Sequence, residues 1–201
     1  QQRFVSDVSH ELRTPLTTIR MASDVIYAAR EGFDPTISRS AELLLSQIDR
    51  FEELLTDLLE VSRFDAQVAT LSLSRIDITK LVNRCVEDLA MDAKQRDVKI
   101  RIDAPQEELL IDGDLRRIER IMRNLLANAI DHAEGNPVDL TIKDSQSAVS
   151  IAVRDYGVGI ATHHLERVFD RFWRADPSRS RIRGGTGLGL SIAREDANLH
   201  G

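Results

Sequence analysis

The chain has 201 residues, of which 42% are hydrophobic and 30% are charged, and this is enough for one ordinary globular domain or two small ones. Its net charge of −6 argues against a surface that neutralises nucleic-acid phosphates, so we expect no nucleic-acid partner. The single cysteine, Cys85, excludes an internal disulfide, and no run of about eighteen apolar residues marks a membrane span. Because helical patterning begins almost at Gln1, without a starting methionine, the sequence predicts a soluble fragment of a longer protein.

The first segment, residues 4–30, has the periodicity of a helix with one apolar stripe. Gly32 and Pro35 interrupt this pattern in "EGFDP", so we expect the helix to end near Arg30. The apolar side chains recur at steps of three and four residues: Phe4, Val8, Leu12, Leu16, Ile19, Ala22 and Ile26.

The second segment carries a heptad seam on a further helix, which predicts an antiparallel helical hairpin. The seam is too long and too apolar for two helices to bury. We therefore expect two copies of the chain to pack as a four-helix bundle, and docking of the hairpin onto the rest of the chain is the alternative. The seam residues are Ile37, Ala41, Leu44, Ile48, Phe51, Leu55 and Leu58.

A single histidine, His10, lies on the polar side of the first helix. At about 100° per residue it falls opposite the apolar stripe, and the bland alternative is a solvated histidine with no role. Glu11 can orient an imidazole nitrogen or accept its proton, and the Thr14 hydroxyl stands one turn further along the same face. Pro15 removes a backbone N–H, so we expect a bend that could act as a hinge.

A domain boundary is predicted between about residues 64 and 76, where the heptads stop and a linker leads into a short strand. The helices and mostly antiparallel strands beyond it predict an α+β sandwich with helices on one face. These elements are a helix near 77–96, strands near 98–103 and 108–112, a helix near 114–132, and a strand pair at 138–144 and 147–155.

Two asparagines, Asn124 and Asn128, share one face of the helix "RNLLANAIDHA", while apolar residues cover the other side. Their carbonyl oxygens suit Mg²⁺, which takes its other oxygen ligands from water and phosphates. The alternative is an amide pair that satisfies backbone groups in the core.

The strand "IAVRDYGVGI" ends in Asp155 and is followed by Gly157 and Gly159. The glycines permit close backbone approach, and a carboxylate at a strand end can accept hydrogen bonds from an exocyclic amine such as that of adenine. An ordinary glycine-containing turn is the alternative.

The segment "GGTGLGLSIA" holds Gly184, Gly185, Gly187 and Gly189 and runs into a helix, whose N-terminal N–H groups can bind an anion. It lacks the lysine of a GxxxxGK[ST] loop and follows no strand, so neither familiar phosphate motif fits. The preceding "RFWRADPSRSRIRGG" is basic and rich in serine and glycine, which predicts a mobile lid over a polyphosphate or a disordered surface loop.

Five segments together resemble the signature boxes of the bacterial two-component sensor histidine kinase core, and they span practically the whole chain. The segments "NAIDHAE" and "FWRADPSR" look especially like those of the MtrB-type kinases of actinobacteria. The five boxes, in chain order, are "FVSDVSHELRTPLTT", "NLLANAIDHA", "DYGVGI", "VFDRFWRAD" and "GGTGLGLSIA".

The resemblance implies an all-α hairpin that forms a dimeric four-helix bundle, followed by an α+β two-layer sandwich of the ATP-binding fold shared with gyrase, Hsp90 and MutL. Residues 1–66 would be the dimerisation and histidine phosphotransfer domain, 67–75 a linker, and 76–201 the catalytic ATP-binding domain. Because the chain stops at Gly201, we expect that domain to lack its last strands.

The implied reaction is ATP-dependent autophosphorylation of His10, followed by phosphoryl transfer to an aspartate in the receiver domain of a response regulator. Glu11 would act as the base or orienting partner of His10. Thr14 would help to place water if the protein also acts as a phosphatase of that regulator. The whole protein would be a sensor anchored in the plasma membrane, with this portion in the cytoplasm.

The implied cofactors are ATP and Mg²⁺. Asn128 would bind the metal with Asn124 nearby, Asp155 would read the adenine amine, and Arg174 would offer a cation to the γ-phosphate. Phe169 and Phe172 would anchor the base of the lid. The remaining residues of the implied nucleotide site are His132, Gly157, Gly159, Gly185, Thr186, Gly187, Leu188 and Gly189.

One position departs from the family pattern: Asp131 stands where many members carry Lys or Arg near the phosphates. This removes a cation or leaves its task to Arg174 and the lid. Two rival functions remain, a nucleotide-responsive switch without histidine phosphorylation and a catalytically inactive helical scaffold. The switch gives no reason for "SHELRTP", and the intact Asn128, Asp155 and glycine segments argue against the scaffold.

Overall fold

The computed structural model describes residues 2–66, 69–105, 107–145, 148–175 and 186–201, and in the first helix it describes the side chains of Leu12 and of residues from Thr14 onward. The chain divides into two compact units, Gln1–Ala69 and Thr70–Gly201. Each unit has its own hydrophobic cluster.

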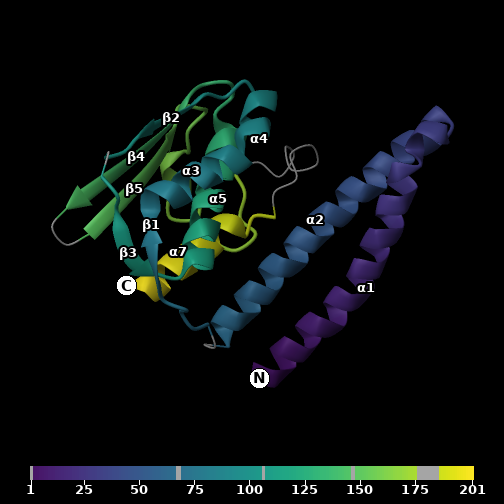
Figure 1. The fold of residues 1–201 in the computed structure, drawn as a ribbon, viewed down its shortest axis with the longest axis horizontal. Helices are drawn as coiled ribbons and strands as arrows, with labels where there is room; N and C mark the ends of the chain where they lie inside the picture. The colour runs from purple at the N-terminus through teal and green to yellow at the C-terminus, as the bar shows by residue number, and fades with distance from the viewer. Residues whose placement is uncertain (1, 67–68, 106, 146–147, 176–185) are drawn as a thin grey trace. The chain divides into compact units, whose positions relative to one another are not determined.

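The first unit is the predicted antiparallel helical hairpin (Figure 1). Helix α1 (Gln2–Ala28) leads through the short 3-10 turn η1 (Arg30–Gly32) into α2 (Pro35–Asp65). The Asp34 carboxylate caps α2 by accepting the Thr36 backbone N–H at 2.9 Å, and Pro35 occupies the first turn, where no N–H is required. Pro15 lies inside α1, which continues as a helix on both sides of it, so the hinge stays a prediction.

The hairpin buries a narrower set of side chains than the predicted seam. Leu16 of α1 packs with Ile48 and Leu55 of α2. Ala22 of the expected stripe is exposed in the single chain, whereas the neighbouring Ser23 is buried and its hydroxyl donates to a backbone carbonyl one turn earlier at 2.9 Å. The face of α1 that meets α2 therefore includes only part of the apolar stripe.

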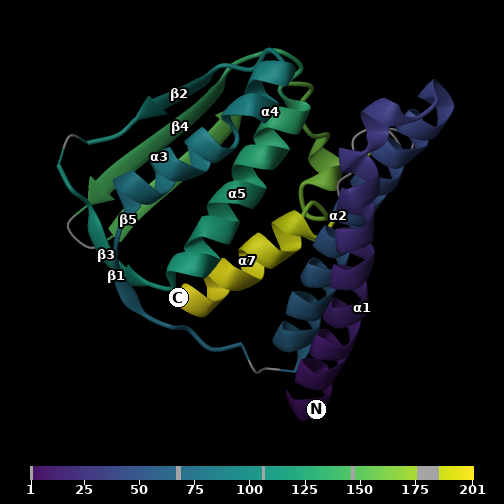
Figure 2. The same ribbon diagram turned by 45° about the vertical axis from the view of Figure 1, so that its right-hand side comes forward.

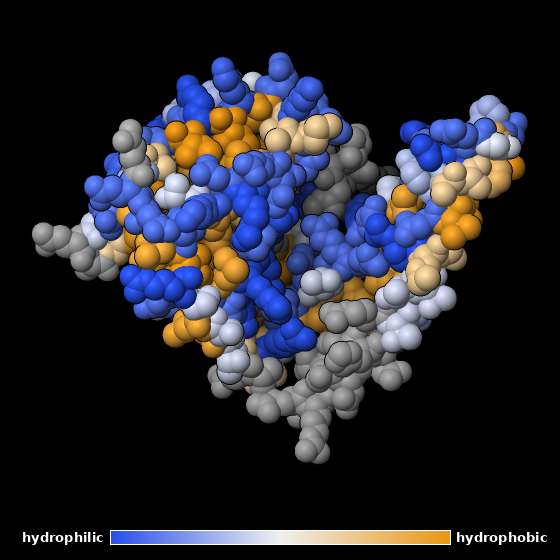
Figure 3. All heavy atoms as spheres, viewed as in Figure 1, coloured by the Kyte–Doolittle hydropathy of each residue, from blue (hydrophilic) through white to orange (hydrophobic). Residues whose placement is uncertain are grey.

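The rest of the seam lies at the surface of the single chain, where Figure 3 shows hydrophobic side chains in orange on the hairpin helices. A row of large apolar side chains along two helices favours burial against another surface. Seven residues of the α1 stripe and the α2 seam are between 40% and 56% exposed: Leu12, Ile19, Ile26, Ile37, Leu44, Phe51 and Leu58.

The second unit contains two small sheets. Strands β1 (Ser74–Asp77) and β3 (Leu110–Gly113) form an antiparallel pair. In the three-stranded sheet, β4 (Val138–Ser145) pairs in parallel with β2 (Ile100–Asp103) and antiparallel with β5 (Ala148–Asp155). Two of the three described pairings are antiparallel, as predicted.

Four described α-helices belong to this unit, and Figures 1 and 2 show α3 and α5 across one face of the three-stranded sheet. The single helix expected near 77–96 is two helices, because the chain leaves helical geometry at Leu89. A 3-10 turn, η2 (Thr162–His164), follows β5. The helices are α3 (Ile78–Asp88), α4 (Ala90–Gln95), α5 (Leu115–His132) and α7 (Gly189–His200).

The main core lies between α3, α5 and the three-stranded sheet. Met122 and Leu126 of α5 and Leu140 of β4 are buried there, together with Cys85 of α3. Burial, with a smaller effect of the Glu119 carboxylate, raises the pKa of the Cys85 thiol, so the side chain behaves as a small apolar residue. Among the described residues, none of the helices has both the length and the apolar character needed to cross a membrane.

Candidate functional site

The polar face of α5 presents the two predicted asparagines. The Asp114 carboxylate begins this helix by accepting the backbone N–H groups of Arg116 and Arg117 at 3.1 and 3.3 Å. The buried face of α5 points into the core, so Asn124 and Asn128, four residues apart, lie together outside the main apolar stripe and are both half-buried. Both asparagines therefore lie at the margin of the core.

The N-terminus of α7 lies directly against Asn124. A Cβ atom built on Gly189, the first residue of α7, would stand 3.0 Å from Asn124 Oδ1. The apolar Leu188 precedes Gly189 and has no side-chain group that could cap the helix. The open N-terminal turn of α7 and the asparagine face of α5 thus share one location.

The loop after β5 packs on the other end of the same helix. The Gly157 N–H donates to Asp155 Oδ1 at 3.0 Å, and a Cβ on Gly157 would lie 1.8 Å from the backbone oxygen of His132, the last residue of α5. Only glycine fits at that distance, so Gly157 fixes the half-buried Asp155 beside the C-terminus of α5. Gly159 has a positive φ of 69° with open space around its Cα.

A third contact positions the glycine-rich segment. Gly187 has a φ of 74°, and a Cβ there would lie 3.0 Å from the Phe172 backbone, whose N–H donates to the Gly187 oxygen at 2.9 Å. The Thr186 hydroxyl accepts the Leu188 N–H at 3.2 Å, and Leu188 is fully buried. Phe172 therefore anchors the segment that leads into α7.

Arg174 is half-buried and lines a cavity of about 580 Å³ together with Arg167 and Arg171. Its lining carries three guanidinium groups and one carboxylate, that of Asp170, which lies 3.6 Å from Arg167, so the net positive charge favours an anion. Phe169 is 36% exposed and is not among the lining residues of this cavity, whereas Phe172 is. The predicted lid is residues 171–185, and its part at 176–185, which includes Gly184 and Gly185, lies outside the described residues.

The candidate phospho-acceptor lies in the other unit. His10 and Glu11 are in helical backbone of α1, and their side chains are outside the described ones. Thr14 is exposed one turn along, and its carbonyl accepts the Thr18 hydroxyl at 3.3 Å. Among the predicted nucleotide residues, the contacts above bring together two groups: Asn124 with Gly189, and His132 with Asp155 and Gly157.

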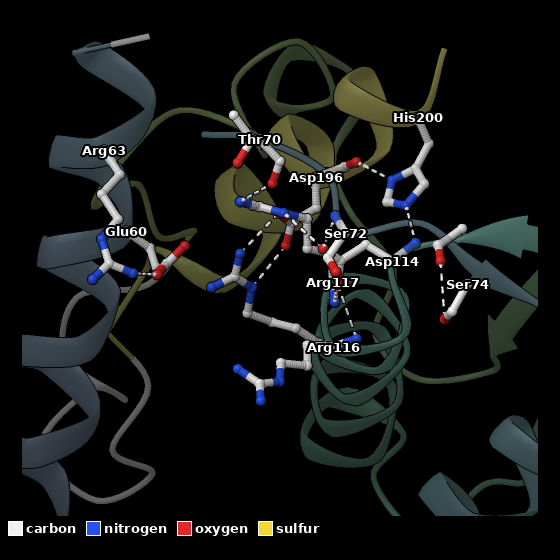
Figure 4. A network of polar contacts seen from close by, with 12 residues as sticks. Glu60, Arg63, Thr70, Ser72, Ser74, Asp114, Arg116, Arg117, Asp196 and His200 are labelled. Atoms are coloured by element: carbon white, nitrogen blue, oxygen red, sulfur yellow. Dashed lines mark hydrogen bonds and ion pairs between the residues drawn. The ribbon is translucent and has the colours of Figure 1, made fainter. Parts of the chain in front are cut away.

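A polar network that the sequence did not predict joins the start of α5 to the end of α7 (Figure 4). The fully buried Asp196 carboxylate accepts from Arg117 at 2.7 Å and from Arg120 at 2.7 and 2.8 Å. His200 bridges the two helices, accepting the Asp114 N–H at 3.0 Å through Nε2 and contacting the Asp196 carbonyl at 2.7 Å through Nδ1. The sequence contains one signal for this network. Asp196 lies four residues after Ile192, so it shares a face of α7 with that apolar side chain.

The same network holds the chain segment that enters the second unit. The Asp114 carboxylate accepts the Ser72 backbone N–H at 2.9 Å, and Arg117 donates to the Thr70 carbonyl at 3.2 Å. Partial burial acts to raise the pKa of Asp114, but the N–H donors of Ser72, Arg117 and Arg116 and the Arg117 charge hold that pKa below its ordinary value.

Two family models match the chain in turn. The His Kinase A (phospho-acceptor) domain matches residues 1–67, and the histidine kinase-, DNA gyrase B-, and HSP90-like ATPase matches residues 113–201. The first match contains His10, and the second contains the asparagine face and all the glycine contacts described above.

Relatives and solved structures agree with both matches. The chain is 53% identical over 200 residues to the sensor histidine kinase MtrB of Mycobacterium tuberculosis (strain H37Rv) and 39% identical over 211 residues to the signal transduction histidine-protein kinase AfsQ2 of Streptomyces coelicolor. These alignments include 100% of this chain but only 35% and 38% of the relatives, so the chain spans about a third of their length.

Two structures show the fold over nearly the whole chain. Full-length ShkA in complex with AMPPNP superposes with a TM-score of 0.80 at 26% identity, covering 98% of this chain and 41% of ShkA. The Acinetobacter baumannii histidine kinase AdeS superposes with a TM-score of 0.66 at 22% identity, covering 94% and 86%. The chain therefore belongs to the sensor histidine kinase family, with a phospho-acceptor hairpin followed by an ATPase domain of the type found in histidine kinases, DNA gyrase B and HSP90.

Proposed function

We propose that this chain is the catalytic core of a protein-histidine kinase, which phosphorylates His10 from ATP and then passes the phosphoryl group to an aspartate of a response regulator. The observation that supports this most directly is the convergence of both glycine segments on α5, at Asn124 and at His132, in a chain whose first unit matches a phospho-acceptor domain. The full-length ShkA structure holds AMPPNP, which supports ATP as the nucleotide.

Glycine lets the backbone of these segments come close to α5 and to Phe172, and this shapes the proposed nucleotide site. Gly157, Gly187 and Gly189 each stand where a Cβ would be 3.0 Å or less from a neighbouring atom, so these segments pack tightly without side chains of their own. Asp155 at the strand end would accept the adenine amine, and the uncapped first turn of α7 would face the phosphates. Thr186, Leu188 and the adjoining Gly185 would shape this turn.

Mg²⁺ suits the same place. When bound, the metal would neutralise phosphate charge, and the Asn128 carbonyl oxygen would be its protein ligand with Asn124 beside it. Arg174, in its cavity of three arginines, would offer a cation to the γ-phosphate.

At His10 an imidazole nitrogen would attack the γ-phosphorus. The new P–N bond would form as the bond to the leaving oxygen of ADP breaks, and Glu11 would take the imidazole proton. In the second step the phosphoryl group would leave the nitrogen for a carboxylate oxygen of the regulator. We propose that Thr14, exposed one turn away, would place water if the protein also removes that phosphate.

A homodimer through residues 1–66 would bury the exposed apolar row of the hairpin in a four-helix bundle. Residues 67–75 would act as the linker to a catalytic domain at 76–201. Because the nucleotide and the histidine belong to different units, movement of one unit toward the other would control the reaction, with Pro15 as a candidate hinge. The whole protein would be membrane-anchored, with this portion in the cytoplasm.

The test is incubation of the dimeric protein with γ-labelled ATP and Mg²⁺. We expect a label that is lost in acid and stable in base, as a phosphoramidate is, and that is absent in His10→Gln and in Asn128→Ala. Asn128→Ala should keep the dimer, which sedimentation would confirm. A wild-type protein that takes up no label would contradict the proposal.

A further inference from the structure

Asp131 lies on the same face of α5 as the two asparagines. At about 100° per residue, Asn128 is rotated about 40° from Asn124 around the helix axis and Asp131 about 20° in the other sense. All three side chains are half-buried. An acidic group therefore stands in the row that the proposed function assigns to Mg²⁺ and phosphates.

The two glycine contacts bracket this position. Gly189 packs on Asn124, one end of the row, and Gly157 packs on the backbone of His132, the residue after Asp131. A carboxylate with an unbalanced charge at this point would repel the polyphosphate of a nucleotide held between them. The chain must therefore either tolerate that repulsion or neutralise it.

Arg96 supplies the neutralising charge. Its guanidinium Nη2 lies 2.7 Å from Asp131 Oδ1, with the two side chains 36% and 31% exposed. Arg96 directly follows α4 as its C-cap, and the next residue, Asp97, has a φ of 56° that turns the chain toward β2. The pair thus joins the end of α4 to the polar row of α5.

The position of Arg96 is fixed by packing and does not depend on the ion pair alone. A small hydrophobic cluster ties the α4–β2 turn to the C-terminal end of α5 on both sides of Arg96. Its buried members are Ala93, Val98, Ala129, Ile130, Ala133 and Val138. The core therefore holds the backbone on both sides of Arg96 close to the end of α5, within reach of Asp131.

We propose that Arg96 is a positioning residue for the nucleotide: it holds the Asp131 carboxylate in an ion pair and so keeps that charge from opposing the phosphates. The inference rests on the proposed nucleotide site. It gives the chain a cation from α4 that compensates for the acidic residue at position 131.

The test is calorimetric titration of Mg²⁺–AMPPNP into four proteins: wild type, Arg96→Gln, Asp131→Asn and the double variant. Arg96→Gln should weaken binding about three- to tenfold, because it leaves a carboxylate facing the phosphates at the edge of the protein. Asp131→Asn should bind as well as the wild type or better. The double variant should return to within about twofold of the wild type, since both charges are gone.

Two further measurements separate this electrostatic role from a structural one. The defect of Arg96→Gln should shrink at high salt, where the Debye length falls to about 3 Å at 1 M. Adenosine, which has no phosphates, should bind Arg96→Gln as it binds the wild type. Lys80→Gln is the control, because it removes one cation and its two ion pairs, with Asp77 and Glu108, and should leave AMPPNP binding unchanged.

The outcomes are distinct. A wild type that binds no AMPPNP would overturn the proposed nucleotide site itself. With a binding wild type, the inference about Arg96 fails if Arg96→Gln binds normally, if the double variant stays as weak as Arg96→Gln, or if Asp131→Asn alone weakens Mg²⁺–AMPPNP binding, which would make Asp131 a ligand. Arg96→Gln and the double variant both lack the ion pair. If loss of the pair impaired folding, both would bind weakly, so recovered binding in the double variant cannot be an effect of folding.

Discussion

Arg117 of α5 and Asp196 of α7 form an ion pair with an Nη1–Oδ1 distance of 2.7 Å around a carboxylate that is fully buried. Arg120 completes the arrangement with two further hydrogen bonds to the same carboxylate. The opposite end of α7 touches Asn124 through Gly189. One helix therefore connects the segment that enters the second unit with the candidate nucleotide site.

Loss of the buried charge should unfold the second unit at lower denaturant. We expect Asp196→Asn to reduce its free energy of unfolding by about 3 kcal/mol or more, because two guanidinium groups lose their anion. The single tryptophan, Trp173, lies in this unit and reports its urea unfolding by fluorescence. The exposed pair of Arg123 and Asp88 provides the control, and Asp88→Asn should cost less than about 1 kcal/mol. Equal effects of the two variants would show that the buried carboxylate has no special role.

The Asp114 cap should make the stability of the second unit depend on pH. Its folded pKa lies below the ordinary value of 3.8, so its stabilising contribution is fully present above that value and is lost as the pH falls through the folded pKa. The difference in unfolding free energy between wild type and Asp114→Asn should therefore be constant near neutral pH and shrink below about pH 4. A difference that grows on acidification would contradict the assigned direction of the pKa shift.

Gly157 should not tolerate a methyl group. Gly157→Ala places a Cβ 1.8 Å from the His132 oxygen, so the loop after β5 must move away from α5. We expect a loss of about 2 kcal/mol or more in the stability of the second unit, measured by Trp173 fluorescence. Gly32→Ala, in the first unit and with no atom within 4 Å of its Cβ, should leave the unfolding of the second unit unchanged. Normal stability of Gly157→Ala would mean that the loop does not pack on α5 as described.

The exposed apolar row should determine the oligomeric state. Phe51, 56% exposed on α2, should be buried in a dimer, so Phe51→Glu should produce a monomer in sedimentation experiments at concentrations where the wild type is dimeric. Ser46→Glu places the same charge elsewhere on the exposed surface of α2 and should leave the dimer intact. A dimeric Phe51→Glu protein would show that the row has another use.

Local patterns in the sequence predicted most of the elements. Gly32 and Pro35 mark the turn between the two helices of the hairpin. Short-range periodicity predicts α2 from its heptads, and β4 and β5 from their alternation. The break at Leu89 has no glycine or proline beside it, so the periodicity of the sequence predicts one continuous helix there. The burial of Ser23 in place of Ala22 depends on the rotation of α1 against α2, which one helix alone does not specify.

The parts of the candidate site that lie within one short segment could be predicted from the sequence. The asparagine face and the glycine segments are local, and the structure shows Gly189 against Asn124 and Gly157 against His132. Arg96 and Asp131 are 35 positions apart in the sequence, and no local pattern in either segment predicts that they pair.

The central claim is that His10 receives the γ-phosphoryl group of ATP. The most direct measurement is mass spectrometry, at neutral pH, of the tryptic peptide "FVSDVSHELR" after incubation of the protein with ATP and Mg²⁺. We predict the added mass of one phosphoryl group, localised by fragmentation to His10 and absent when Asn128→Ala is treated in the same way. A phosphoryl group on a serine of this peptide, or an unmodified peptide from a dimer that binds AMPPNP, would contradict the account.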